Sequence, residues 1–170
     1  MRNADVAMYE AKRRGRARAL LFDDAMRARL TRFVAIDTSL RRAIGTSQLS
    51  LVYQPIVDLD TLSMVSVEAL ARWHHPELGD VSPAEFIPVA EESGLIAELG
   101  SWVLNESCRQ LAAWRGIDAA NAPRTISVNI SRAELALGDA LLQKVRQALR
   151  HSGLPAHCLQ LEVTRTRRDG

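Results

Sequence analysis

The sequence predicts an α/β fold with a largely parallel sheet, one antiparallel pair of strands and too few residues for a complete barrel, and three observations predict these features. Strand and helix patterns alternate from residue 47 onward, which is typical of parallel strands joined by helices. Only Asp60–Ser63 separates the first two of these strands, so those two must run antiparallel. The chain has 170 residues, whereas a complete α/β barrel takes about 250.

The first 46 residues predict three elements. A helix covers Ala4–Arg14 and a short strand covers Ala19–Phe22. One helix and one strand cannot bury a core, so this opening looks like the tail of a larger domain. A longer helical pattern covers Asp24–Ile44 and ends at Gly45, and we interpret it as a connecting helix.

The alternating part of the chain follows in order. Strands are expected at Leu49–Leu59, Met64–Trp73, Thr125–Ser131 and Cys158–Thr164. Helices are expected at Pro83–Glu92, Ile96–Trp114 and Arg132–Ser152. Helices between successive strands would cover one side of the sheet.

Three of these strands alternate polar and apolar residues. Their more polar faces consist of Glu68, Leu70 and Arg72, then Ser127, Asn129 and Ser131, and finally Gln160, Glu162 and Thr164. An antiparallel sheet with one solvated face gives the same alternation without any active site. Helical crossovers would instead cover the apolar face and turn the polar stripe inward, where a carboxylate needs a partner or a metal ion.

Glu68, Asn129 and Glu162 are the candidate metal ligands. Two carboxylates and an amide carbonyl are hard oxygen donors, which suit Mg²⁺ or Mn²⁺ better than Zn²⁺. Arg72 shares a strand face with Glu68, so it could bind a phosphate in bidentate fashion or simply pair with that glutamate. Gln54 could hydrogen-bond a base or cap the sheet.

Several linked motifs resemble the EAL domain of cyclic di-GMP phosphodiesterases. The tripeptide that names this family stands here as Glu68-Ala69-Leu70. Matching runs occur in the family's order at Leu51–Val57, Val67–Trp73, Phe86–Leu95, Ser127–Ser131 and Leu161–Thr164. One tripeptide alone would carry no weight, whereas this linked set is specific.

The resemblance implies an incomplete TIM-type (β/α) barrel with an antiparallel first strand. It also implies that two Mg²⁺ or Mn²⁺ ions activate water, which opens cyclic di-GMP to linear pGpG. The implied roles are metal ligation by Glu68, Asn129 and Glu162, phosphate binding by Arg72, and substrate contact by Gln54 and Leu70.

Residues 4–26 resemble the end of a GGDEF diguanylate cyclase domain, without its signature loop. We therefore divide the chain into four parts. These are a GGDEF remnant at residues 1–26, a linker helix at 27–46, the N-terminal half of an EAL domain at 47–164, and a divergent basic tail at 165–170.

The sequence departs from the EAL pattern after Thr164. The family has another glutamate there, whereas this chain continues with Arg165, and the family's later paired aspartates, lysine, glutamate and glutamine have no counterpart. We therefore expect a truncated chain, from a frameshift or a broken gene, that has no turnover. The alternative is a non-catalytic module that binds cyclic di-GMP or another protein. Bare sheet edges also predict a homodimer or other self-association.

Composition argues against other function classes. The chain is 47% hydrophobic and 25% charged, as globular proteins are. It has no apolar run long enough to cross a bilayer and no signal-peptide pattern, which predicts a cytoplasmic protein whose parent could still be anchored upstream. Basic clusters at Lys12–Arg18 and Arg165–Arg168 lack interleaved aromatic residues, so we expect no nucleic-acid binding.

Overall fold

The computed structural model describes residues 24–163. The helices are α2 (Asp24–Ala43), α3 (Pro83–Ser93), α4 (Ile96–Ile117), α5 (Arg132–Leu135), α6 (Asp139–Ser152) and the 3₁₀ turn η1 (Ala156–Cys158). The strands are β1 (Leu49–Val57), β2 (Met64–His75), β3 (Gly79–Val81), β4 (Thr125–Ile130) and β5 (Leu159–Val163). The helix and strand predicted before residue 23 and the basic tail lie outside the described residues.

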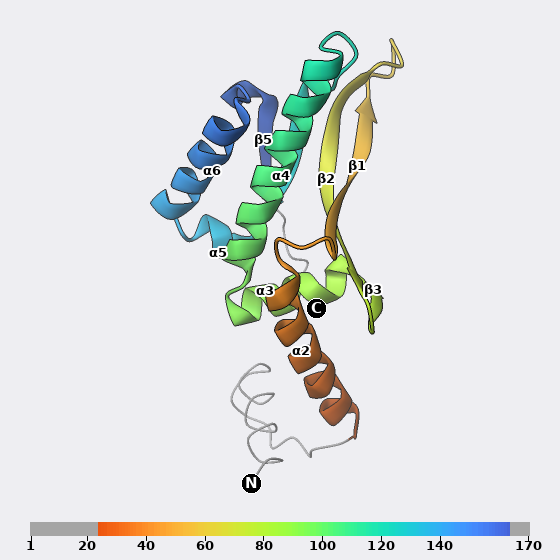
Figure 1. Cartoon of the computed structure of the whole chain (residues 1–170), viewed down its shortest axis with the longest axis vertical. Coiled ribbons are helices and arrows are strands. Elements are labelled where there is room, and N and C mark those ends of the chain that lie inside the picture. Colours follow the sequence, from red (N-terminus) through yellow and green to blue (C-terminus); the bar gives the residue numbers. More distant parts are fainter. Residues whose placement is uncertain (1–23, 164–170) are drawn as a thin grey trace.

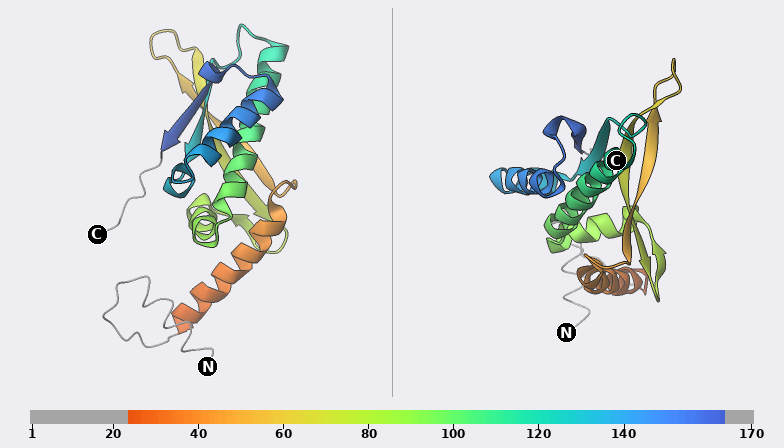
Figure 2. Two further views of the ribbon diagram at one scale, coloured as in Figure 1. Left: turned by 90° about the vertical axis from the view of Figure 1, so that its left-hand side faces the viewer. Right: turned by 45° about the horizontal axis from the view of Figure 1, so that its top comes forward.

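One mixed sheet organises the described chain. Its strands follow the order β1-β2-β4-β5, with β3 paired to β2. β1 and β2 run antiparallel, whereas β4 is parallel to both β2 and β5. Helices α4 and α6 lie together on one face of this sheet (Figures 1 and 2). The predicted α/β architecture with an antiparallel first strand is therefore confirmed.

Helix α2 packs against α3 at one end of the sheet (Figure 1). Ile36 and Leu40 of α2 are buried in one apolar cluster with Phe86 of α3. The Arg32 guanidinium donates two hydrogen bonds to Glu85, from Nε to Oε1 at 2.6 Å and from Nη2 to Oε2 at 3.1 Å. These hydrogen bonds hold the pKa of Glu85 below its ordinary value. Both apolar and ionic contacts thus fix α2 on α3.

A second apolar cluster lies between the sheet and α4. Val67 of β2 and the strand residues Ile126 and Val128 of β4 are buried there against Leu104 and Leu111. These strand residues alternate with the polar ones, so the covered face of the sheet is the apolar face. The other face carries the polar side chains.

The helix predicted over Arg132–Ser152 is wrong in one respect, because it forms two helices. Gly138 adopts a φ of 55°, which a continuous right-handed helix cannot contain, and it separates α5 from α6. The Ser131 side chain starts α5 by accepting a hydrogen bond from the Glu134 N–H at 3.1 Å.

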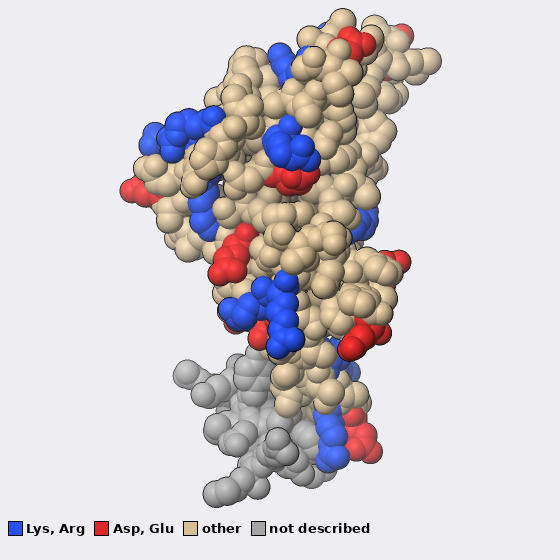
Figure 3. All heavy atoms as spheres, viewed as in Figure 1, with Lys and Arg blue, Asp and Glu red and all other residues tan. Residues whose placement is uncertain are grey.

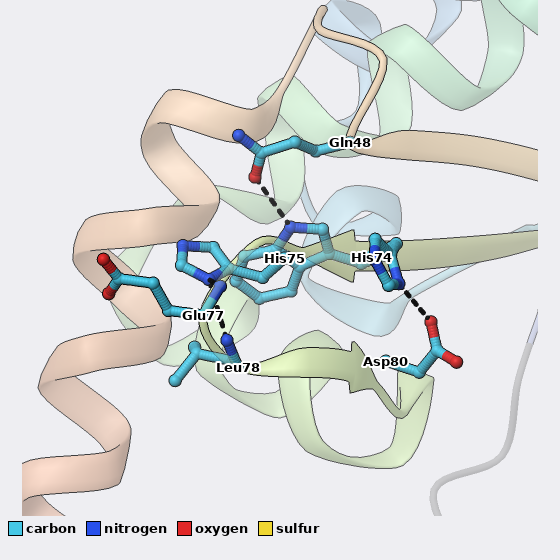
Figure 4. A network of polar contacts seen from close by, with 7 residues as sticks. Gln48, His74, His75, Glu77, Leu78 and Asp80 are labelled. Atoms are coloured by element: carbon cyan, nitrogen blue, oxygen red, sulfur yellow. Dashed lines mark hydrogen bonds and ion pairs between the residues drawn. The ribbon is translucent and has the colours of Figure 1, made fainter.

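Strand β3 is an element that the sequence patterns did not predict. Figure 4 shows the turn that brings it back onto β2. His75 Nδ1 accepts hydrogen bonds from the N–H groups of Glu77 and Leu78, both at 3.1 Å. His74 Nδ1 lies 2.7 Å from Asp80 Oδ1 across the same pair of strands. A three-residue strand is too short to show alternation, so the sequence pattern carries no signal for it.

Candidate functional site

The sheet registers align polar residues from four strands. Gln54 of β1 lies opposite Glu68 of β2. Glu68 lies beside Ser127 of β4, and Ser127 lies beside Gln160 of β5. Residues that are opposite one another in a register point to the same face. We call Gln54, Glu68, Ser127 and Gln160 the polar row.

Two more predicted site residues lie on the same face as the polar row. Asn129 and Glu162 are register partners on β4 and β5. The Asn129 side-chain amide donates from Nδ2 to Glu68 Oε1 at 2.6 Å, which joins β4 to β2. Ser127 Oγ donates to Gln160 Oε1 at 3.1 Å within the row. The three candidate metal ligands therefore come from three adjacent strands, and two of them touch.

Burial differs between these predicted site residues. Glu68 and Asn129 are partly buried, whereas Glu162 and Gln54 are exposed. The helices pack on the opposite, apolar face of the sheet. Among the described residues, α4 and α6 thus leave the face that bears the candidate ligands open, and solvent reaches its outer strands.

Arg72 does not form the ion pair that one interpretation of the sequence suggested. Its exposed guanidinium donates from Nη1 to the backbone oxygen of Ala71 at 2.9 Å. Within residues 24–163, Glu68 has Asn129 as its hydrogen-bond partner rather than Arg72. The Arg72 side chain therefore keeps donors that a phosphate could accept.

A cavity of about 430 Å³ lies beside the ligand face. Its walls include Glu68, Leu70, Arg72 and Asn129, four of the six residues predicted for the site. Two helices line it as well, α3 with Pro83, Ala84, Ile87, Pro88 and Glu91, and α4 with Ile96, Leu99, Gly100 and Val103. Gln54 and Glu162 are not among the lining residues. The volume falls within the range of small-molecule sites.

These residues suit a hard divalent cation by their chemistry. Asn129 Nδ2 is engaged by Glu68, so the carbonyl oxygen of the amide is the atom left to bind a cation. The set is small, however. Across residues 24–163, no three or more His, Cys, Asp and Glu side chains gather into a metal-binding cluster.

Glu134 is a residue that our sequence reasoning missed. It lines the same cavity and is only 4% exposed. Its carboxylate accepts hydrogen bonds from the Ser131 N–H at 3.0 Å and the Ser131 hydroxyl at 2.9 Å. Burial raises the pKa of Glu134 above its ordinary value. A serine followed three residues later by a glutamate is a capping-box pattern, so the sequence did hold a signal for it.

Charges on the helical side are mixed. Figure 3 shows Lys and Arg residues scattered over α6, α4 and α2 with Asp and Glu residues between them. In α4, for example, Arg109 Nη2 lies 2.6 Å from Glu106 Oε1. Within the described part of the chain, no helix combines the length and apolar character needed to span a membrane.

Comparison with known proteins identifies the family. The sequence profile named "EAL domain" matches residues 37–169. This chain belongs to the EAL domain family. Residues 1–36 lie outside the match, so the proposed GGDEF remnant receives no support from it.

Relatives of this EAL domain are much longer proteins. The chain is 44% identical over 165 residues to the bifunctional diguanylate cyclase/cyclic di-GMP phosphodiesterase MucR of Pseudomonas aeruginosa, covering 96% of this chain and 24% of MucR. It is 38% identical over 166 residues to the cyclic di-GMP phosphodiesterase PdeR of Escherichia coli, with the same two coverages. The chain thus spans about a quarter of the length of each.

A solved structure supports the barrel-type architecture of this EAL domain. The structure described as the PaMucR phosphodiesterase in complex with cyclic di-GMP matches with a TM-score of 0.71 and 41% identity. The match covers 79% of this chain and 54% of the other. The described sheet and helices therefore correspond to part of an EAL barrel.

Proposed function

We propose that this chain is a segment of a cyclic di-GMP phosphodiesterase domain. The segment binds a phosphate of the substrate and supplies part of the metal ligands. In this proposal Glu68, Asn129 and Glu162 hold Mg²⁺ or Mn²⁺, Arg72 binds a phosphate oxygen, and Gln54 and Leu70 contact the dinucleotide. Ions bound there would supply an activated water and neutralise charge on the attacked phosphodiester.

The contact between Asn129 and Glu68 carries this proposal. It joins two side chains that carry hard oxygen atoms, from neighbouring strands, with Asn129 Nδ2 2.6 Å from Glu68 Oε1. Arg72 opens onto the same cavity as these two side chains. A cyclic dinucleotide carries two phosphates and two flat bases, so cationic, carboxylate and apolar walls in one cavity suit it.

We also propose that the 170-residue chain by itself does not hydrolyse cyclic di-GMP. The candidate ligands offer two carboxylates and one amide to metal ions, whereas two-metal hydrolysis needs enough ligands to hold two ions about 3.5–4 Å apart. The remaining ligands would come from EAL motifs that have no counterpart in this sequence. We retain as further proposals that residues 1–26 derive from a GGDEF domain and that residues 165–170 are a divergent tail.

A phosphodiesterase assay on the purified chain tests both statements. With Mg²⁺ or Mn²⁺ present, we expect no linear pGpG above that from the Glu68→Gln variant. Isothermal titration with cyclic di-GMP should detect heat that is lost in Arg72→Ala. Robust hydrolysis would refute the loss of turnover, and titration without any heat would refute the binding role.

The second candidate function is a non-catalytic module that binds another protein. The outer strands β1 and β5 bear exposed apolar side chains, among them Val52, Leu161 and Val163. Each outer strand is paired on one side within the described sheet, which favours addition of another strand. We therefore also propose self-association. X-ray scattering over a concentration series tests it, and a particle that stays monomeric throughout would contradict it.

A further inference from the structure

A buried carboxylate lies at the end of the strand that carries Asn129. Glu134 is the only Asp, Glu, Lys or Arg among the buried residues in the described part of the chain. Burying a carboxylate is costly unless hydrogen bonds compensate for the lost water. A helix cap can form at the surface, so the need for a cap does not by itself explain this burial. Its placement therefore calls for a specific reason.

The Glu134 carboxylate contacts the residue that follows β4. Its Oε2 accepts from both the N–H and the hydroxyl of Ser131, at 3.0 and 2.9 Å. Ser131 directly follows Ile130, the last residue of β4, and lies two residues after Asn129. Residues two apart on a strand point to the same face. Fixing Ser131 therefore fixes the direction in which the end of β4 presents Asn129.

Helix α4 approaches the carboxylate closely at Gly100. A Cβ added to Gly100 would lie 1.7 Å from Glu134 Oε1, so glycine is what allows α4 to approach this closely. Lys144 Nζ donates to the backbone oxygen of Ala97 at 2.5 Å, which ties α6 to the same turn of α4. Lys144 attracts the Glu134 carboxylate and Glu91 repels it. The Glu134 carboxylate thus lies between Gly100 of α4 and Ser131 at the end of β4.

We propose that Glu134 is a positioning residue for the site, which holds the end of β4 so that the Asn129 amide meets Glu68. This inference rests on the proposed function, because Asn129 and Glu68 are proposed metal ligands. Glu134 acts through Ser131 and the β4 backbone, and it touches neither ion nor substrate. The 2.6 Å contact between Asn129 and Glu68 is the geometry that it maintains.

Side-chain amide NMR on the ¹⁵N-labelled full chain tests this proposal without any metal. The Asn129 Nδ2 signals are assigned by their loss in Asn129→Ala, and their proton exchange reports the hydrogen bond to Glu68. We expect Glu134→Ala to shift these signals and to speed their exchange by about tenfold or more, because the amide then loses its hydrogen bond to the Glu68 carboxylate. Glu134→Gln keeps the carbonyl acceptor for Ser131, so it should preserve the wild-type signals.

Two further variants keep the test decisive if Glu134→Ala does not fold. Gly100→Ala should displace the carboxylate and perturb Asn129 in the same way, whereas Gly116→Ala in the same helix should leave it unchanged, because nothing lies within 4 Å of the added Cβ. Unchanged Asn129 signals in a folded Glu134→Ala or Gly100→Ala variant would overturn the proposal. Disturbed signals in Glu134→Gln would overturn it as well.

Mn²⁺ titration separates this inference from the proposed function. Partners that orient metal ligands contribute about 10- to 100-fold to affinity, so Glu134→Ala should weaken Mn²⁺ binding by that factor and Glu134→Gln should restore it. If the wild-type chain binds no Mn²⁺, the metal role of Asn129 fails. The metal-free NMR result would then still decide whether Glu134 positions Asn129.

Discussion

The Asn129 amide donates a 2.6 Å hydrogen bond from Nδ2 to Glu68 Oε1 across strands β4 and β2. The two strands are parallel, and Glu68 is in register with Ser127, so Asn129 reaches back along the sheet to make this contact. A negatively charged acceptor strengthens such a bond. It also sets the orientation of the amide, with the carbonyl oxygen free to face a cation.

Replacement of Glu68 by glutamine should separate metal binding from stability. The side-chain carbonyl that Glu68→Gln introduces can still accept from Asn129, so the melting temperature should stay within a few degrees of wild type. Loss of the negative charge should weaken Mn²⁺ binding by more than about tenfold in titration calorimetry, since even outer partners of metal ligands contribute that much. The control Asp80→Asn removes an exposed carboxylate outside the site and should leave binding unchanged. Equal affinities for wild type and Glu68→Gln would show that Glu68 is not a ligand.

Gly100→Ala should destabilise the fold, whereas Gly116→Ala should not. Both glycines lie in α4, but only a Cβ at Gly100 meets an atom, Glu134 Oε1 at 1.7 Å. Overpacking of this kind costs about 1–3 kcal/mol. At Gly116 the added methyl meets no atom within 4 Å, so the higher helix propensity of alanine should stabilise the fold by about 0.5–1 kcal/mol. Urea denaturation of both variants measures the sign of each change in the free energy of unfolding. An unchanged free energy of unfolding for Gly100→Ala would mean that the Glu134 side chain can move aside.

The polar face could be predicted from the sequence because it depends on alternation between residues that are neighbours along the chain. Period-two alternation separates Glu68 from Val67 and Asn129 from Val128, and in each case the structure buries the apolar partner more deeply. The largely parallel sheet was predicted from the alternation of strands and helices, and the antiparallel pairing of the first two strands from their short connection. What the sequence could not supply was the register, which depends on contacts between strands that lie far apart along the chain.

Other features escaped prediction for identifiable reasons. Gly138 lies inside a stretch with good helical periodicity, so only its positive φ reveals the break between α5 and α6. The burial of Glu134 depends on how closely α4 approaches at Gly100, which is a tertiary contact. The capping-box spacing from Ser131 to Glu134 was readable, but spacing does not indicate that the carboxylate is enclosed.

The Arg32 and Glu85 pair should contribute modestly to the docking of α2. The two side chains are 39% and 38% exposed, so a double-mutant cycle with alanine should give about 0.2–1 kcal/mol, and salt should reduce it. The pKa of Glu85 is lowered by Arg32, so this contribution is present above the ordinary value of 4.5 and lost as the pH falls through the lower, folded value. Arg29→Ala, on an exposed position of α2, is the matched control. A coupling energy that grows on acidification would contradict the assignment.

Glu134 should give the opposite pH dependence. Burial raises its pKa above the ordinary value of 4.5, so the folded chain holds this proton more tightly than the unfolded chain does. Its contribution to stability is therefore fully present below about pH 4.5 and declines as the pH rises through the higher, folded value. Glu134→Gln keeps the acceptor for Ser131 but cannot ionise, so its stability relative to wild type should increase across that window. Chemical denaturation at a series of pH values from about 4 to about 8 measures this difference. A difference that stays constant would show that Glu134 titrates alike in the folded and unfolded chains.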